Sequence, residues 1–441
     1  MRRRDHALET GYMEKALAKI KTLFKTGFFH IFGSSVINKV IAFLSSVVLV
    51  RILTKVEYGA FTYAWNIYGM VFILNGMGIE SGMLQLASEH SGDIGYTDKV
   101  SSFGTKFGLQ FNCILAVILL AAGLFAPLKI EAGRPLLCAL CVLPIFQLLY
   151  NLTTVYLRVQ KRNREYAKLQ VANTALVFVV SAGCAFLLRE MGLVVGHYIA
   201  CIAAYLIGHL AFRVRLFDRN AEGIGDEKRP LLRISFISML NNGLSQLMYL
   251  LDLFVLGIVD PQETILASYK VATMIPTALT FIPLSLIIYL YPYFAEHKDD
   301  GKWCLDRYRK ILLGLGGFNL LLSAMLFAAA PLIVRIVFGE QYMDAVPVFR
   351  LLAINYFFSG TFRTLSGNLL VTQRKLRFNL FVAVVSSLIN VIADYFFIQW
   401  WGSMGAALAT VLVVLVSGLL STSFLIYTFV KKAGAAEGEE R

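Results

Sequence analysis

The chain has 441 residues, of which 57% are hydrophobic and 16% are charged, and its formal net charge is +13. Its mean hydropathy of +0.66 excludes a soluble globular protein of this size, because such a protein needs far more charged surface. The basic residues stand in short segments between apolar runs. This is the topology pattern of an integral membrane protein, and it argues against a nucleic-acid-binding stripe.

Residues 1–27 precede the first long apolar run. Apolar residues recur there at helical steps, among them Leu8, Tyr12 and Ala16, and lysines stand between them. The pattern predicts an amphipathic helix that lies on the membrane surface. A solvated leader is the alternative interpretation of the same segment.

Apolar runs long enough to cross a bilayer, about 20 residues each, recur along the rest of the chain. They predict an all-α integral membrane protein with about twelve transmembrane helices. The expected spans are 28–53, 59–87, 103–127, 135–157, 169–188, 192–212, 234–259, 264–294, 308–334, 346–371, 378–399 and 403–430.

The basic residues also predict the orientation of these spans. When both termini are placed in the cytoplasm, most of the 41 Lys and Arg residues fall in cytoplasmic segments. An odd number of spans would destroy this asymmetry, so we expect an even number and two cytoplasmic termini. The basic residues left on the outside are Arg51, Lys55, Lys129, Arg134, Arg189, Arg335 and Arg350.

The two halves of the chain resemble each other. QKRNR begins at Gln160 and QRKLR begins at Gln373, and MGLVVGHYIA and WGSMGAALAT follow at matching places. Because each half holds six spans, an even number, we expect parallel repeats around a central cavity, with alternating access. The predicted segments are a bundle at 28–212, a cytoplasmic linker at 213–233, a second bundle at 234–430 and a cytoplasmic tail at 431–441.

Several spans carry polar residues at membrane depth, where a carboxylate costs about 2.5–3.5 kcal/mol. The seventh span has a polar stripe at helical steps that ends at Asp252, and the eleventh places Asn390 and Asp394 one turn apart. The twelfth adds Thr410 and the carbonyl of Ala406. These hard oxygen ligands are expected at similar depth in the outer half and suit Na⁺ or a proton. Hydrogen bonds between helices are the alternative role for Asn390 and Asp394.

Four basic residues lie within or beside the spans. Lys39, Lys270 and Arg363 fall inside spans, and Arg51 stands at the outer end of the first. Cations at this depth without enough carboxylates to neutralise them favour an anionic ligand, and phosphate is the common one. For Arg51, snorkelling to the interface is the alternative.

Enzymatic function is not expected. The outer loops are short, and the sequence contains no HExxH, GxSxG or P-loop motif. A membrane glycan polymerase would need a large catalytic loop on the outside, which the sequence lacks. A non-transporting scaffold is disfavoured by the polar stripes in several spans.

The order of several stretches resembles the polysaccharide flippases of the multidrug/oligosaccharidyl-lipid/polysaccharide (MOP) superfamily. These stretches include LSSVVLVRILTKVEYGAFTYAW, SYKVATMIPTALTFIPLSL, VFGEQYMDAVPVFRLLAI and GNLLVTQRKLRFNL. The resemblance covers about residues 28–430. It implies a transporter that moves undecaprenyl-diphosphate-linked oligosaccharides across the bacterial cytoplasmic membrane for capsule, O-antigen or cell-wall polysaccharide assembly. The implied partners are a polyprenyl-diphosphate-linked glycan, the lipid bilayer and polysaccharide assembly proteins, with no nucleic acid.

The resemblance also bears on the polar residues in the spans. Related lipid II flippases bind Na⁺ through an Asp of the seventh helix, an Asn and an Asp of the eleventh, and a carbonyl and a Thr of the twelfth. It therefore implies that Asp252, Asn390, Asp394, Ala406 and Thr410 hold a coupling ion, Na⁺ or H⁺. Inward flow of this ion, or the membrane potential, would reset the cycle. The four basic residues named above would bind the diphosphate. A cation-coupled drug exporter of the same superfamily is the alternative, but it would need an acidic cavity.

Overall fold

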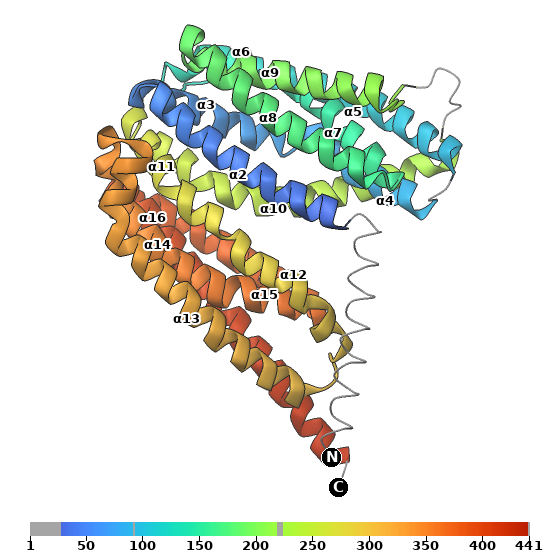
Figure 1. The fold of residues 1–441 in the computed structure, drawn as a ribbon, viewed down its shortest axis with the longest axis vertical. Helices are drawn as coiled ribbons and strands as arrows, with labels where there is room; N and C mark the ends of the chain where they lie inside the picture. The colour runs from blue at the N-terminus through green and yellow to red at the C-terminus, as the bar shows by residue number, and fades with distance from the viewer. Residues whose placement is uncertain (1–27, 91–92, 218–223, 440–441) are drawn as a thin grey trace, which may run out of the picture. The chain divides into compact units, whose positions relative to one another are not determined.

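The computed structural model describes residues 28–90, 93–217 and 224–439. The amphipathic helix predicted at 1–27 lies outside this part of the chain. The described residues fold into helices joined by short turns and contain no strand (Figure 1). The prediction of an all-helical membrane protein is therefore confirmed.

Within the described residues, nine helices are long and apolar enough to cross a membrane. The pair Gly133–Leu140 and Leu143–Val159, bent by 46°, adds a tenth if it counts as one span. One of the nine, Leu376–Gly434, covers both of the last two predicted spans. The exact number of twelve stays a prediction.

Contacts divide the chain into two compact units, each of which combines separate segments. Unit 1 comprises the described residues of Met1–Ile52, Val71–Phe125 and Leu137–Gly243. Unit 2 comprises Leu53–Met70, Ala126–Leu136 and Leu244–Arg441. The bundle boundaries expected from the sequence stay a prediction.

Unit 1 is built on long helices that pack side by side. Helix α8 packs along both α2 and α9, and α7 packs against α4, α5 and α9 (Figure 1). Its core is apolar and includes Ile79, Met83, Leu148 and Leu152, all buried. The helices of this unit are α2 (Phe28–Ile52), α4 (Ile79–Glu89), α5 (Ile94–Phe125), α7 (Leu143–Val159), α8 (Asn163–Leu188), α9 (Glu190–Leu206) and the first half of α10 (Lys228–Val259).

A polar network holds a break between α3 and α4 in unit 1. Gly76 and Met77 have positive φ angles of 53° and 51°, which is unfavourable for a side chain such as that of Met77. Asn112 of α5 is fully buried. Its Oδ1 accepts a bond from Gly76 N, and its Nδ2 donates to Asn75 Oδ1 and Pro144 O, all at 2.7 Å. This one amide therefore fixes the turn that leads into α4.

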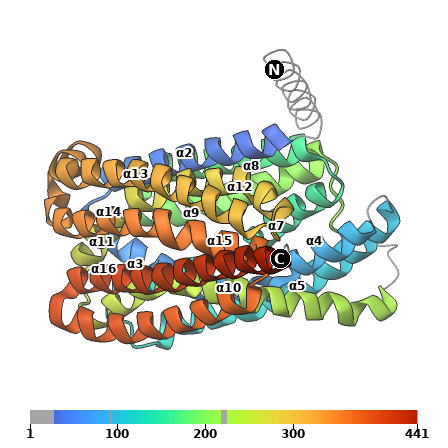
Figure 2. The same cartoon turned by 90° about the horizontal axis from the view of Figure 1, so that it is seen from below.

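Unit 2 contains most of the remaining helices. Helix α14 packs against both α13 and α16 (Figure 2), and a buried cluster that includes Tyr308, Leu365, Leu369 and Phe429 fills the space between α13, α15 and α16. The helices are α3 (Lys55–Phe72, except its last two residues), the second half of α10, α11 (Glu263–Leu279), α12 (Phe281–Glu296), α13 (Gly301–Ile333), α14 (Val346–Phe358), α15 (Thr364–Thr372) and α16 (Leu376–Glu439).

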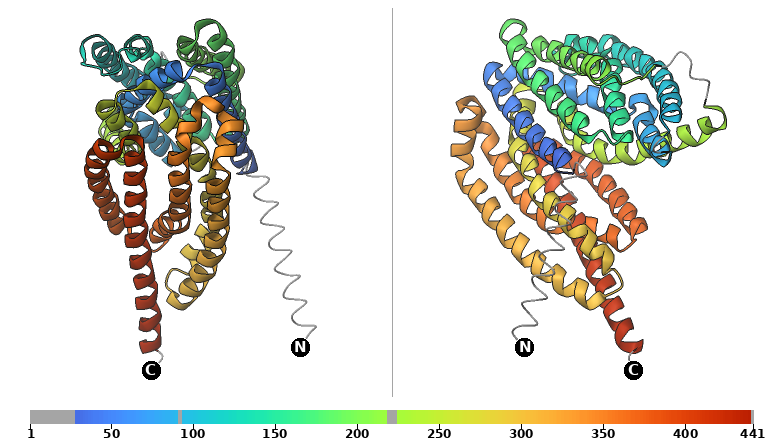
Figure 3. Two further views of the ribbon diagram at one scale, coloured as in Figure 1. Left: turned by 90° about the vertical axis from the view of Figure 1, so that its left-hand side faces the viewer. Right: turned by 45° about the vertical axis from the view of Figure 1, so that its right-hand side comes forward.

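Helix α16 is a hairpin rather than one rod (Figure 3). A straight helix of its length would span about 96 Å, far more than a bilayer of about 30 Å. Gly402 breaks it with φ 54° and ψ −131°. A Cβ on Gly405 would lie 1.9 Å from Phe397 O, so only glycine lets the two arms approach this closely.

The same turn recurs in unit 1, between α8 and α9. Arg189 has φ 52° and ψ −132° there, and a Cβ on Gly192, three residues later, would lie 2.4 Å from Cys184 O. Lys161 and Arg374, the second residues of QKRNR and QRKLR, also share positive φ angles of 57° and 58°. These matching backbone turns support the predicted internal repeat.

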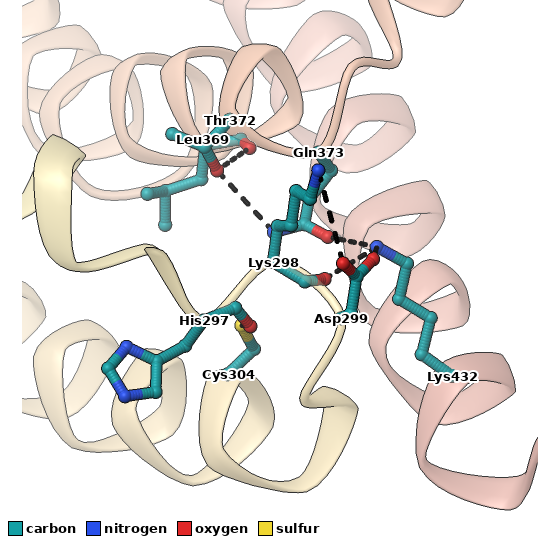
Figure 4. Close-up of polar contacts among 8 residues, drawn as sticks. All are labelled: His297, Lys298, Asp299, Cys304, Leu369, Thr372, Gln373 and Lys432. Carbon is teal, nitrogen blue, oxygen red and sulfur yellow. Dashed lines mark hydrogen bonds and ion pairs between the residues drawn. The ribbon is translucent and has the colours of Figure 1, made fainter. Parts of the chain in front are cut away.

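Lys432, near the end of α16, ties together three parts of unit 2 (Figure 4). Its Nζ donates to Lys298 O at 2.5 Å and to Gln373 Oε1 at 2.8 Å, and it lies 3.6 Å from Asp299 Oδ1. Gln373 is buried. The ammonium therefore joins the α12–α13 turn and the α15–α16 turn to the last helix.

Replacing Lys432 by Met is expected to destabilise this end of unit 2 by about 1–3 kcal/mol, because it leaves the buried oxygen of Gln373 without its charged donor. Thermal unfolding of the purified protein in detergent measures the effect as a lower midpoint. The matched control is Lys431→Met, which removes the same charge from an exposed neighbour. Equal midpoints for the two variants would show that the contacts of Lys432 do not contribute to stability.

Candidate functional site

Unit 2 contains a cavity of about 610 Å³, a volume typical of small-molecule sites. Residues of α10, α11, α14, α15 and both arms of α16 line it. Five of the residues predicted from the sequence are among them, namely Asp252, Lys270, Arg363, Asn390 and Thr410. Side chains predicted for an ion and for an anionic ligand therefore share one space.

Asp252 is the centre of a hydrogen-bonded cluster that joins three helices. Its Oδ2 accepts bonds from Thr410 Oγ1 at 2.7 Å and from Tyr269 OH at 2.9 Å. Asn390 Nδ2 lies 3.4 Å from Oδ1. These donors come from α11 and from both arms of α16. Each suits an ionised carboxylate, which only accepts hydrogen bonds.

The backbone of Ala406 completes the cluster. Thr410 Oγ1 lies 3.1 Å from Ala406 O and 2.7 Å from Asp252 Oδ2. A hydroxyl carries one proton and can donate only one strong bond at a time. The shorter contact indicates that the hydroxyl donates to the Asp252 carboxylate. The Ala406 carbonyl oxygen then keeps a lone pair that is available beside Asp252.

Asp394 is the unusual member of the cluster. Its side chain is fully buried, and it interacts electrostatically with Asp252. Neither of its carboxylate oxygens has a hydrogen-bond donor in the described part of the chain, and the same holds for Asn390 Oδ1. Buried acceptors without donors are costly and rare in native proteins. These three oxygens, beside the carboxylate of Asp252, fit a bound cation or proton.

The chemistry of these groups narrows the choice of cation. No group of three or more His, Cys, Asp or Glu side chains among the described residues is arranged to hold a metal ion. The cluster instead offers two carboxylates with amide, hydroxyl and carbonyl oxygens. Such hard oxygen ligands, without thiolate or imidazole, do not suit zinc or copper. They fit Na⁺ or a proton.

Lys270 and Arg363 give the cavity its positive charge. Lys270 follows Tyr269 in α11, and Arg363 ends the short π-helix Ser359–Arg363 between α14 and α15. Such π-helical turns are frequent at functional sites. Neither side chain forms an ion pair with a described residue. Both therefore remain available to an anionic ligand.

The other two predicted basic residues belong to unit 1. Lys39 and Arg51 both lie on α2, and both side chains are exposed. The residues that line the cavity of unit 2 do not include them. Their proposed contact with a diphosphate stays a prediction, as does the ion-binding role of the cluster around Asp252.

Several polar residues of the cavity were not singled out from the sequence, among them Tyr269, Asn355 and Asn368. Asn355 and Asn368 stand in the same predicted span as Arg363, and a search for every amide within a span would have found them. Asn355 Oδ1 is buried and has no donor among the described residues, so it can accept a bond from a ligand hydroxyl or amide.

Known proteins match this chain in sequence. A family model described as "Polysaccharide biosynthesis protein" matches residues 48–347. The lipopolysaccharide biosynthesis protein WzxC of Escherichia coli K12 is 24% identical over 407 residues, which cover 86% of this chain and 76% of that protein. An uncharacterized membrane protein in the cps region of Klebsiella pneumoniae is 27% identical over 162 residues. That match spans 36% of this chain and only 32% of the Klebsiella protein.

Solved structures share the fold. An inward-facing multidrug resistance MATE family transporter of the MOP superfamily has a TM-score of 0.74 at 14% identity, covering 90% of this chain and 96% of that one. The lipid II flippase MurJ, in an inward closed conformation, has a TM-score of 0.70 at 15% identity, with coverage of 91% and 89%. These likenesses show that the fold is that of MOP-superfamily transporters. Since the family model matches more than half of its residues, the chain belongs to the polysaccharide biosynthesis protein family.

Proposed function

We propose that this multi-pass membrane protein is a flippase that moves undecaprenyl-diphosphate-linked oligosaccharides across the bacterial cytoplasmic membrane. The products would serve capsule, O-antigen or cell-wall polysaccharide assembly. Family membership and the likeness to WzxC and to the MurJ fold support this proposal. The observation that carries it is the cavity of unit 2, in which Lys270 and Arg363 stand without an ion-paired acid among the described residues.

In the proposed mechanism, Lys270 and Arg363 bind the diphosphate, and Lys39 and Arg51 of α2 add positive charge. A guanidinium binds phosphate oxygens in a bidentate manner, and an ammonium acts as a point charge. The amides of Asn355 and Asn368 offer hydrogen bonds to the first sugars. No bond is made or broken, so the protein acts as a transporter by alternating access and not as an enzyme.

The cluster around Asp252 would supply the coupling ion. Asp252, Asn390 and Asp394, with the carbonyl of Ala406 and the hydroxyl of Thr410, would bind Na⁺ or H⁺. We place both termini in the cytoplasm, as the distribution of basic residues predicts. Polysaccharide assembly proteins would be the partners that receive the flipped glycan.

The test is the identity of the lipid that copurifies with the protein. Native mass spectrometry of gently purified protein is expected to detect a polyprenyl-diphosphate glycan. The Lys270→Ala/Arg363→Ala double variant should lose it, because it removes both cations of the cavity. The control is Lys375→Ala/Arg377→Ala, which removes two exposed charges near the start of α16 and should retain the lipid. Ordinary phospholipids alone, in all three proteins, would contradict the proposal.

A cation-coupled drug exporter is the second candidate, because a MATE family transporter shares the fold with a TM-score of 0.74. Cationic drugs need an acidic site that is not offset by basic groups. The cavity of unit 2 holds Lys270 and Arg363 beside Asp252, which disfavours this role. Efflux of cationic dyes driven by an ion gradient, with no bound polyprenyl diphosphate, would favour the exporter.

A further inference from the structure

The cavity of unit 2 brings groups of opposite charge into one space. Asp252, Lys270 and Arg363 line it, and Asp394 interacts with Asp252 from beside it. None of the ion pairs among the described residues joins the two acids to the two bases. In surroundings of low dielectric constant, a charge that binds at one group is felt strongly at the others.

We propose that a monovalent cation at Asp252 and Asp394 and the diphosphate at Lys270 and Arg363 bind cooperatively, so that the cavity takes up both together. The inference rests on the proposed function, because the diphosphate ligand comes from it. A cation at the two carboxylates makes the cavity more positive and so attracts the anion. The anion in turn offsets the two basic side chains and strengthens cation binding.

The ligand chemistry allows joint occupancy. The cation uses oxygen acceptors, including the Asp394 and Asn390 oxygens that lack donors among the described residues. The diphosphate uses N–H donors of Lys270 and Arg363. Since no group has to serve both ligands, the two do not compete for a shared partner. A volume of about 610 Å³ leaves room for both.

The backbone adds a second connection between the two ligands. Tyr269 donates to Asp252, and the next residue of α11 is Lys270. Arg363 packs against the second arm of α16, where a Cβ on Gly418 would lie 3.5 Å from Arg363 N. Thr410, a ligand of the proposed ion site, stands two turns earlier on the same arm. Each basic residue therefore stands on, or packs against, a helix that also carries an ion ligand.

Cooperative binding has a consequence for transport. The coupling free energy is reciprocal, so the cation must strengthen diphosphate binding by the same factor as the diphosphate strengthens cation binding. An exchange in which the cation displaces the head group from this cavity is then excluded. When both ligands are bound, the cation balances part of the negative charge of the diphosphate.

The test uses inorganic pyrophosphate as the probe and the full chain in nanodiscs of zwitterionic lipid. Calorimetry compares pyrophosphate binding in NaCl and in choline chloride at the same ionic strength. We expect binding about fivefold tighter, or more, in NaCl. If a proton takes the place of Na⁺, titrations without Na⁺ in two buffers of different ionisation enthalpy will instead show proton uptake on pyrophosphate binding. The comparison of the two salts in the wild-type protein shows whether the cation strengthens or weakens pyrophosphate binding.

The Asp252→Asn/Asp394→Asn variant shows where the cation acts. It should still bind pyrophosphate, but with no dependence on Na⁺ and with less proton uptake. Weaker wild-type binding in Na⁺ would overturn the inference, as would binding that ignores both Na⁺ and protons. An unchanged Na⁺ effect in the variant would also overturn it, since the cation would then act elsewhere. In these three outcomes the anion site of the proposed function stands. Absence of pyrophosphate binding under every condition would remove the anion site and the cooperativity with it.

Discussion

Replacement of Asp394 by Asn is expected to slow flipping by about tenfold or more and to remove its dependence on the coupling ion. The side chain keeps its size but loses its charge, and a charged contact of this kind contributes about 1.5–3 kcal/mol, which corresponds to about tenfold or more in binding. The measurement is flipping of a fluorescent lipid-linked glycan in proteoliposomes, at several Na⁺ concentrations and pH values.

Thermal stability gives an independent readout for the same variant. Both oxygens of Asp394 are buried without donors among the described residues. In the absence of a cation, the neutral amide should therefore raise the unfolding midpoint while transport falls, as is common where an active site is strained. The control is Asp306→Asn, an exposed carboxylate that pairs only with Lys310 among the described residues. A variant at Asp394 that kept both its rate and its ion dependence would rule out the proposed role.

The composition of this site was predictable because helical spacing is a local property. Asn390 and Asp394, like Ala406 and Thr410, stand four residues apart, which places each pair on one face of a helix. The directions of the predicted spans placed Asp252 at the same depth, and the resemblance to lipid II flippases implied the same set of residues. The structure places Thr410 within 2.7 Å and Asn390 within 3.4 Å of the Asp252 carboxylate.

The grouping of the basic residues was not predictable. Hydropathy gives the depth of a residue along a span, but it does not give the direction in which the side chain points around the helix axis. Lys39, Lys270 and Arg363 therefore looked alike in the sequence. Only Lys270 and Arg363 share the cavity of unit 2 with Asp252, because packing among α11, α14 and α16 determines which faces meet.

The internal repeat also shows that the backbone turns of the two halves match, whereas the residues of the proposed site do not. The turn residues match in both halves, since Arg189 and Gly402 share one backbone conformation. The ion-site residues do not match. Counted from these turns, His197 occupies the position of Thr410, and Ser181 occupies the position of Asp394. Counted from the QKRNR and QRKLR segments, Lys39 occupies the position of Asp252. Backbone geometry dictates the turns in each unit, whereas no rule of folding requires a carboxylate pair in both.

The polar network of unit 1 was also missed, although its parts are visible in the sequence. Glu80 Oε1 accepts bonds from Asn75 Nδ2 at 2.6 Å and from Asn151 Nδ2 at 2.8 Å. Asn75 in turn accepts from Asn112. These residues come from three separate segments, and a single sequence carries no signal that joins them. Only tertiary packing brings the carboxylate of Glu80 to neutral amide donors.

Replacement of Asn112 by Leu is therefore expected to be among the most destabilising single changes in unit 1. It would leave Gly76 N and Asn75 Oδ1 without the partner that Asn112 supplies, at about 1–3 kcal/mol each, and it would release a turn in which Met77 holds an unfavourable positive φ. Thermal unfolding of the purified protein, together with its yield from the membrane, measures the loss. Gln110→Leu is the matched control, because it places the same side chain at an exposed position of the same helix. If the two variants unfolded at the same temperature, the Asn112 amide would not be what holds the α3–α4 break.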